Sequence, residues 1–202
     1  TTKLSPHSSF KPLSVYSQAL EKDIINWSSV YEDSPYKLLR DANGNTSDWP
    51  QNASLYYSYM NTGISEAIKV SLNTIAVKCL NDVGVSESVE FMMDNFGFSL
   101  DTELELAKTR GDDEVIGNIA LGSLYTGVSP LEMAGAYGIF ATGGVYSKPC
   151  TITDICSTSG EVLYHTEKKP KNVISKDTAY IMNKLLQKVT ENGATGVDAY
   201  IS

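Results

Sequence analysis

Helical periodicity, with little strand signal beside it, is the feature that most constrains the fold of this chain. Apolar residues recur at three- and four-residue spacing in four clear segments, which is the pattern of helices that bury one face. A serine, a residue type that caps helix N-termini, opens each segment: Ser8, Ser86, Ser129 and Ser175. The first segment extends to about Glu21, and the other three end at glycines. The sequence therefore predicts a mainly helical chain.

Local signals add detail to this organisation. Ser129-Pro130-Leu131-Glu132 is a capping box with proline at the first helical position, and it predicts a helix start. Residues 151–155 and 161–165 alternate around a glycine-containing loop and predict a β-hairpin. Residues 31–60 predict a long polar loop, which in a compact domain is usually functional or a surface cover.

Charge and hydropathy exclude two classes of partner. Lysine and arginine number 16 and the acids 24, so the net charge is −8. A nucleic-acid binder needs a basic surface that displaces counterions from phosphates, and anionic lipid attracts basic segments. No apolar run approaches the roughly 20 residues that a transmembrane helix needs. We therefore expect no nucleic acid and no membrane span in this chain.

Cysteine and histidine are too few and too scattered for a metal site. The two histidines, His7 and His165, and the three cysteines show no ligand spacing. Cys150 and Cys156 are six apart in a predicted strand, about 20 Å at ~3.3 Å per residue. A disulfide needs Cα atoms within about 7 Å, so this pair is excluded unless the strand folds back. The three thiols, Cys79 included, are expected to serve as small apolar side chains.

Ser8-Ser9-Phe10-Lys11 places a hydroxyl and an amine three residues apart at a predicted helix start. That spacing puts Ser8 and Lys11 on one face. A serine attacks only when a base takes its proton, and lysine is such a base once burial and a positive field lower its pKa. An ordinary helix cap at Ser8 is the alternative. Ser34-Pro35-Tyr36-Lys37 has the same spacing but no helical continuation.

Ser71-Leu72-Asn73 interrupts a helical pattern over residues 62–83. Ser and Asn favour caps and turns, so two short helices, Ile64–Val70 and Thr74–Asp82, are expected to meet there. The hydroxyl of Ser71 could relay a proton to a leaving amine, and the carboxamide of Asn73 could hold a substrate amide. A turn stabilised by its own side chains is the alternative.

Together these motifs resemble the transpeptidase domain of penicillin-binding proteins, within the β-lactamase-like superfamily of serine D,D-peptidases. The bifunctional class, with a glycosyltransferase domain upstream, fits best. Other stretches are also similar to that family: Trp49-Pro50-Gln51-Asn52, Gly63-Ile64-Ser65-Glu66-Ala67-Ile68, Ala120-Leu121-Gly122, Val128-Ser129-Pro130-Leu131-Glu132-Met133-Ala134 and Phe140-Ala141-Thr142-Gly143-Gly144.

The resemblance implies an α/β β-lactamase-like transpeptidase fold, truncated here to its predominantly α-helical half plus a small β-hairpin. Residues 1–202 would form an incomplete domain. Residues 1–144 would be the helical part with both motifs, residues 145–170 the hairpin, and residues 171–202 a helix that leads to an absent third-motif strand.

The resemblance also implies a function, peptidoglycan D,D-transpeptidation. Ser8 would attack the penultimate D-alanine of a stem peptide ending in D-Ala-D-Ala, with Lys11 as base. Ser71 would pass a proton to the leaving amine, and Asn73 would bind the peptide amide. β-Lactams would trap Ser8 as an ester, and no metal or organic cofactor is needed. The parent protein would be extracytoplasmic and anchored to the cell membrane, although this chain carries no anchor.

Two departures from the family pattern affect this interpretation. His7 stands where the family usually has glycine, so that turn is expected to differ. No Lys-Thr-Gly or Lys-Ser-Gly occurs, and Lys108-Thr109-Arg110 lacks the glycine. The third motif supplies an oxyanion-hole amide, whose loss costs ~10²–10³ in rate, so the chain alone is expected to be nearly inert. A D,D-carboxypeptidase or β-lactamase, a β-lactam sensor domain and a non-catalytic scaffold remain alternatives.

Overall fold

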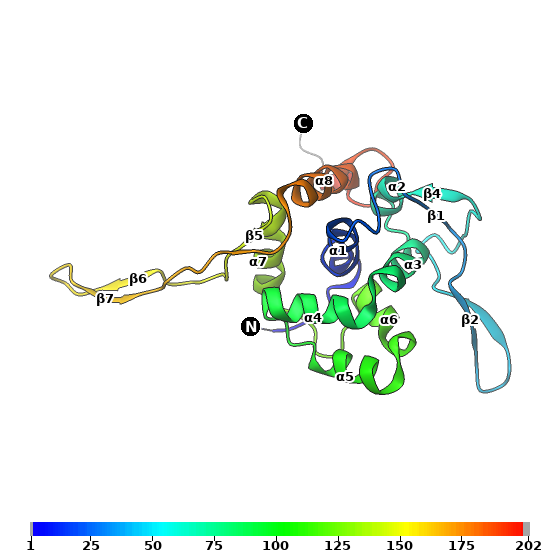
Figure 1. Cartoon of the computed structure of the whole chain (residues 1–202), viewed down its shortest axis with the longest axis horizontal. Helices are drawn as coiled ribbons and strands as arrows, with labels where there is room; N and C mark the ends of the chain where they lie inside the picture. Colours follow the sequence, from blue (N-terminus) through cyan, green and yellow to red (C-terminus); the bar gives the residue numbers. More distant parts are fainter. Residues whose placement is uncertain (1, 200–202) are drawn as a thin grey trace.

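The segment that begins near Ser8 lies at the centre of a ring of helices (Figure 1). In the computed structural model, which describes residues 2–199, every side chain from Phe10 to Leu20 is buried. This central segment ends in α1 (Ser17–Glu21). Five longer helices surround it: α3 (Asn73–Val83), α4 (Val85–Phe96), α6 (Asp112–Leu121), α7 (Pro130–Ala141) and α8 (Lys176–Gln187). The prediction of a mainly helical chain is confirmed.

The central segment is not the regular α-helix that the apolar spacing predicts. It begins as a 3-10 helix (His7–Phe10), continues as a π-helix (Pro12–Tyr16) and only then becomes α-helical. Side chains take up the carbonyl groups of the widened turn. The Gln18 amide donates to the Leu13 carbonyl at 3.0 Å, and Ser88 Oγ donates to the Ser14 carbonyl at 2.6 Å. These bonds keep buried carbonyl groups paired where the regular ladder is broken.

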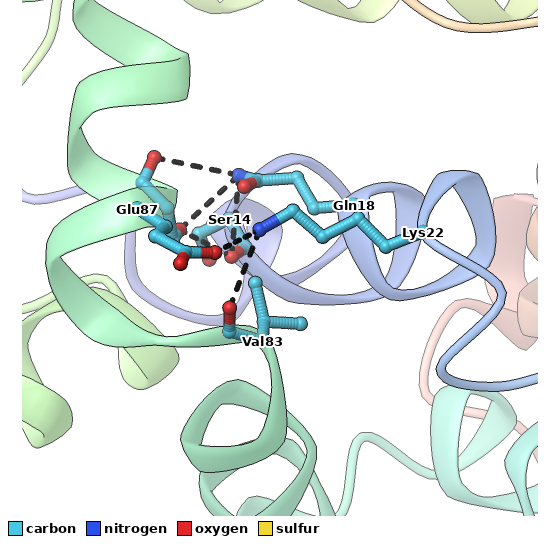
Figure 2. Close-up of polar contacts among 6 residues, drawn as sticks. Ser14, Gln18, Lys22, Val83 and Glu87 are labelled. Atoms are coloured by element: carbon cyan, nitrogen blue, oxygen red, sulfur yellow. Dashed lines mark hydrogen bonds and ion pairs between the residues drawn. The ribbon is translucent and has the colours of Figure 1, made fainter.

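Figure 2 shows the contact between the central segment and α4. The Gln18 amide, extended from α1, also donates to Ser88 Oγ at 3.1 Å. One turn further along, Lys22 Nζ donates to the Val83 carbonyl at 3.3 Å and forms an ion pair with Glu87. Because these bonds join residues about 60 to 70 positions apart, they fix the central helix against α4 and the end of α3.

Several helix ends follow the predicted signals. The capping box is complete, since the Glu132 amide donates to Ser129 Oγ at 3.2 Å and the Ser129 amide donates to Glu132 Oε2 at 2.7 Å. The Ser175 hydroxyl caps α8 by accepting from the Thr178 amide at 3.1 Å. That helix stops at Gln187, earlier than predicted, and 3-10 helices follow at Lys188–Thr190 and Val197–Ala199.

Two helices have no counterpart in the prediction, α5 (Asp101–Arg110) and α6 (Asp112–Leu121). The apolar periodicity of α5 is weak, because this helix buries the carboxyl-bearing side chain of Glu103. In α6 the buried apolar residues do recur at helical spacing, at Val115, Ile116, Ile119 and Ala120. Both helices start with acidic residues. Those acids are themselves a helix signal, since negative charge near an N-terminus and positive charge near a C-terminus favour the helix dipole. Charge at both ends marks α5, whereas α6 has acidic residues at its start and an apolar spacing that also indicates a helix.

Residues 31–60 are not the continuous loop that their polarity predicts. Strands β2 (Lys37–Arg40) and β3 (Thr46–Trp49) lie within this region, β1 (Val30–Glu32) overlaps its start and β4 (Asn61–Gly63) follows its end. Strand β1 pairs with β4, and β2 pairs with β3, both antiparallel. The Asp41 carboxylate closes the β2–β3 turn by accepting from the amides of Asn43 and Asn45 at 2.9 and 2.8 Å. Asx hydrogen bonding therefore builds a hairpin from polar sequence.

The predicted β-hairpin is confirmed and protrudes from the helical body (Figure 1). It consists of β6 (Asp154–Cys156) and β7 (Val162–His165), paired antiparallel. At its base, β5 (Val145–Tyr146) pairs with β8 (Lys171–Asn172). The remaining helix, α2 (Ile64–Lys69), packs against α3 and α8.

The cysteines only partly follow their predicted role. Cys79 is a buried apolar side chain, and burial raises its pKa to about 12. Cys150 and Cys156 are exposed, so the expectation of three apolar thiols is wrong for these two. Residues 2–199 contain no disulfide and no cluster of three potential metal ligands. None of the helices in the described part of the chain has the length and apolarity needed to cross a membrane.

Candidate active site

The Lys11 amine lies among oxygen atoms of the turn between α2 and α3. Its Nζ donates to Asn73 Oδ1 at 2.7 Å, and to the carbonyl oxygen and Oγ of Ser71 at 2.9 and 3.1 Å. The Leu72 carbonyl accepts a longer bond at 3.5 Å. These contacts span 60 to 62 positions of the chain. Three of the four predicted site residues therefore meet at one amine.

Burial sets the protonation of this amine. Only 3% of Lys11 is exposed. Because burial disfavours the charged form, it lowers the pKa of Lys11 from 10.5 to about 7. A large share of Lys11 is then unprotonated at neutral pH, and an unprotonated amine can take a proton from a hydroxyl. Of the two causes that the sequence analysis invoked, burial and a helix N-terminus, burial is the one that lowers this pKa.

Ser8, the fourth predicted residue, shares a cavity of about 350 Å³ with Lys11 and Ser71. It lies in the first turn of the central segment and is exposed, whereas Lys11 is buried. Apolar and aromatic side chains form the walls, with Tyr16 from the central segment and Ile68, Tyr137, Leu186 and Val189 from other elements. The hydrogen bonds of Lys11 within the described residues go to residues 71–73 and not to Ser8. The structure therefore places Ser8 and Lys11 on one cavity, large enough for part of a ligand, without a direct bond between them.

The turn that carries Ser71 is strained. Its amide donates to the Ile68 carbonyl at 3.1 Å and closes α2, and α3 begins two residues later. Between the helices, Ser71 has a φ of 57°, in the left-handed region that non-glycine residues rarely adopt. Such strain persists only where surrounding structure holds it, and it is often found at functional sites. The predicted break between two short helices is confirmed.

Both ends of the Asn73 carboxamide are engaged within the protein. Its Oδ1 accepts from Lys11, and its Nδ2 donates to the Gln51 carbonyl at 2.7 Å. Within the described residues, one N–H of Nδ2 and one lone pair of Oδ1 are still free to bind a substrate amide, because each end of a carboxamide can make two hydrogen bonds. The predicted role of Asn73 in binding a substrate amide therefore stays a prediction, while its contact with Lys11 is part of the observed geometry.

The turn before Ser8 keeps a glycine-like backbone without glycine. His7 has a φ of 49°, in the left-handed region. Its amide donates to the Gly122 carbonyl at 3.0 Å. A Cβ atom on Gly122 would lie 2.2 Å from the His7 carbonyl oxygen, so only glycine fits there. The left-handed conformation of His7 lies against Gly122, and the expectation that this turn differs from the family's stays a prediction.

Several residues at the site were not singled out by the sequence analysis. Tyr137 lines the cavity, and its hydroxyl donates to the Ser9 carbonyl at 2.5 Å. Thr195 lines the same cavity and donates through its amide to the Lys69 carbonyl at 3.3 Å. No local spacing connects these residues with Ser8, since their positions depend on the packing of α7 and the C-terminal segment.

The second Ser-x-x-Lys sequence does not form a comparable site. Ser34 Oγ accepts from Lys78 at 2.7 Å, whereas Lys37 forms an ion pair with Asp113 at 3.5 Å. The two side chains therefore serve different contacts. This outcome agrees with the absence of a helical continuation after Lys37 in the sequence.

Comparison with known proteins identifies the family. A family model for the penicillin binding protein transpeptidase domain matches residues 1–201. The chain belongs to this family. Penicillin-binding protein 1A of Clostridium botulinum is 32% identical over 195 residues, and penicillin-binding protein 1F of Bacillus subtilis is 33% identical over 201 residues. These matches cover 95% and 99% of the chain, and they confirm the resemblance drawn from the motifs.

The fold is also that of penicillin-binding transpeptidase domains. The D,D-transpeptidase domain of a peptidoglycan glycosyltransferase from Eggerthella lenta superimposes with a TM-score of 0.75 at 21% sequence identity. That match covers 99% of this chain and 51% of the other. The chain spans 22% of the C. botulinum protein and 25% of the B. subtilis protein. The helix-rich arrangement thus corresponds to about half of the solved domain.

Proposed function

We propose that this chain carries the nucleophile and the base of a peptidoglycan D,D-transpeptidase. The observation that carries the proposal is the buried Lys11 amine, which contacts Ser71 Oγ and Asn73 Oδ1 and shares a cavity with Ser8. A base with a pKa near the working pH is the most effective proton acceptor, and the pKa of Lys11 is about 7. Membership of the penicillin-binding family supports the same chemistry.

In the proposed first step, Ser8 Oγ attacks the carbonyl carbon of the penultimate D-alanine in a stem peptide. Lys11 takes the hydroxyl proton, and the bond to the terminal D-alanine nitrogen breaks. Ser71, whose Oγ lies 3.1 Å from Lys11 Nζ, returns a proton to the leaving amine. An amine of a neighbouring stem peptide then attacks the Ser8 ester, which releases the hydroxyl and forms the cross-link.

β-Lactams would react at the same serine. Attack by Ser8 opens the lactam C–N bond, and the acyl group stays on the serine as an ester. Stem peptides and β-lactams are thus the proposed ligands, and the proposed location is extracytoplasmic with the parent protein anchored to the membrane. The sequence holds no Lys-Thr-Gly motif, which in this family supplies an oxyanion amide, so the 202-residue chain alone would be acylated very slowly.

A labelling experiment with matched serine variants tests the proposal. The full-length gene product and the 202-residue chain are incubated with a fluorescent penicillin, and the modified peptide is identified by mass spectrometry. We expect Ser8→Ala to abolish labelling, whereas Ser9→Ala retains it, because Ser9 Oγ only donates to the Pro6 carbonyl. Labelling of the Ser8→Ala variant at the unaltered rate would overturn the proposal.

The product of a stem-peptide reaction separates transpeptidation from hydrolysis. A pentapeptide substrate is supplied with an acceptor amine, and released D-alanine is compared with cross-linked dimer. Equal amounts of the two products support a transpeptidase. Release of D-alanine without dimer would identify a carboxypeptidase that uses the same serine.

A further inference from the structure

Asp33 is a buried carboxylate outside the cavity, and it is 4% exposed. It accepts hydrogen bonds from Thr74 Oγ1 at 2.7 Å, Asn52 Nδ2 at 2.8 Å and the Ser58 amide at 2.9 Å. Burial by itself would raise the pKa of Asp33, but these hydrogen bonds more than offset it and hold the pKa below its usual value. Asp33 is therefore a charged acceptor at neutral pH.

Asn52 connects this carboxylate with the start of α3. The Asn52 side chain is 2% exposed, and its Oδ1 accepts from the backbone amides of Asn73 and Thr74 at 2.9 and 3.4 Å. Its Nδ2 donates to Asp33 and to the Tyr56 carbonyl at 3.1 Å. Asn52 thus caps α3 from a distant segment of the chain, since the helix has no cap from its own preceding residue.

The acceptor-only chemistry of Asp33 fixes the orientation of this amide. An ionised carboxylate has no hydrogen to donate, so the NH₂ group of Asn52 must face it and the oxygen must face α3. The same logic applies one residue earlier, where the Gln51 carbonyl accepts from Asn73 Nδ2 at 2.7 Å. The oxygen of Asn73 is thereby directed to Lys11. The bond between Lys11 Nζ and Asn73 Oδ1 is the shortest of the four hydrogen bonds of that amine within the described residues.

We propose that Asp33 and Asn52 are positioning residues that hold Asn73, and through Asn73 the Lys11 amine, in the geometry for acyl transfer. The expected effect on acyl transfer rests on the proposed function. The expected effect on the orientation of Asn73 and Lys11 does not. Fastening the loop to α3 would not by itself call for a buried charge, which is costly to desolvate. A carboxylate is required where one orientation of a neighbouring amide has to be enforced.

An exchange of the two side chains tests the proposal. In Asp33→Asn, an NH₂ group can face the donors of Asn52 and Thr74, so the cap on α3 is lost. In the double variant Asp33→Asn with Asn52→Asp, the carboxylate is moved to position 52, where it can accept from the α3 amides and from the carboxamide introduced at position 33. We therefore expect the single variant to lose function and the double variant to recover part of it, because a carboxylate at position 52 cannot donate to the Tyr56 carbonyl.

The exposed turn of β2 and β3 offers a matched control. Asp41 also accepts from backbone amides and from an asparagine side chain, with Asn45 Nδ2 at 2.9 Å from its Oδ2. Asp41→Asn changes the same chemical group within a similar network that does not contact Asn73. This variant is expected to match the unaltered protein in every measurement below.

The first measurement does not depend on activity. The titration of Lys11 is followed by NMR in the chain labelled at its lysine Cε atoms, with Lys11→Met assigning the signal. Asn73 Oδ1 stabilises the ammonium form, so displacement of Asn73 lowers the pKa of Lys11 in Asp33→Asn, and the exchange variant partly restores it. Tyr16 and Tyr137, the other titratable groups that line the cavity, have pKa values raised by burial and stay neutral in this range.

The second measurement is the rate of penicillin acylation of the full-length gene product against pH, with thermal melts to verify folding. Loss of a hydrogen bond to a charged group predicts a fall of about 10- to 100-fold in Asp33→Asn, with the acid limb moved to lower pH. A smaller folded fraction would scale the rate without moving that limb.

Each outcome has one meaning. An unaltered Lys11 titration in folded Asp33→Asn overturns the positioning role. If the unaltered protein is not acylated, the proposed function fails, while the NMR titration still decides whether Asp33 and Asn52 act on Lys11.

Discussion

Burial of Lys11 makes the stability of this fold depend on pH in a direction that can be worked out. The pKa of Lys11 is about 7 in the folded chain and 10.5 ordinarily, a difference that corresponds to about 5 kcal/mol. Between these values the unfolded chain binds more protons than the folded chain, so the free energy of unfolding rises with pH. Below pH 7 both states hold the proton, and this dependence vanishes.

The test compares the protein with Lys11→Met, whose side chain is unbranched, one atom shorter than that of lysine, and cannot titrate. Urea denaturation at several pH values gives the free energy of unfolding of each protein. Between pH 7 and pH 9 the unaltered protein should gain about 2 kcal/mol relative to the variant. Lys168→Met, at an exposed lysine, should leave the pH dependence unchanged. Parallel curves for Lys11→Met and the unaltered protein would refute the assignment of a low pKa to Lys11.

Three further predictions follow from backbone geometry and burial. Gly122→Ala should lower the free energy of unfolding by about 2–4 kcal/mol, and Gly97→Ala by only about 1 kcal/mol. The φ values of the two glycines are similar, 70° and 72°, but only a Cβ atom at position 122 would clash with a neighbouring atom. Equal losses in chemical denaturation would contradict this. His7→Gly should raise the melting temperature by about 2–4 °C, since the exposed His7 sits in a left-handed conformation, and an unchanged temperature would count against strain there. With a thiol reagent, the two exposed cysteines should react in the folded protein and Cys79 only after denaturation. Rapid reaction of all three thiols would refute that difference.

The parts of this molecule that the sequence predicts are those encoded over a few residues. The capping box at Ser129, the break at Ser71 and the hairpin over residues 151–165 each depend on side chains that act on their immediate neighbours. The spacing of Ser8 and Lys11 is of the same kind. Such sequence patterns predict which groups lie close together within one helix or hairpin.

The parts that could not be predicted depend on neighbours far away in the chain. The π-helical turn after Lys11 is held by Ser88, 74 residues from the carbonyl it binds. The left-handed conformation of His7 is imposed by Gly122. Apolar spacing is the same for α- and π-helices over one turn, so it cannot reveal where the helix widens. Such features become visible only when the packing is known.

The contrast between Ser8 and Lys11 explains how one helical segment can supply two groups with opposite needs. A nucleophile must be reachable, and Ser8 is exposed at the rim of the cavity. A lysine base must lose its proton, which requires a surrounding that solvates the ammonium poorly. The contacts of Lys11 in the described chain are neutral oxygen atoms, and burial is the cause of its lowered pKa. A carboxylate in place of Asn73 would favour the ammonium and remove the base, so a neutral carboxamide is the acceptor that orients Lys11 without charging it.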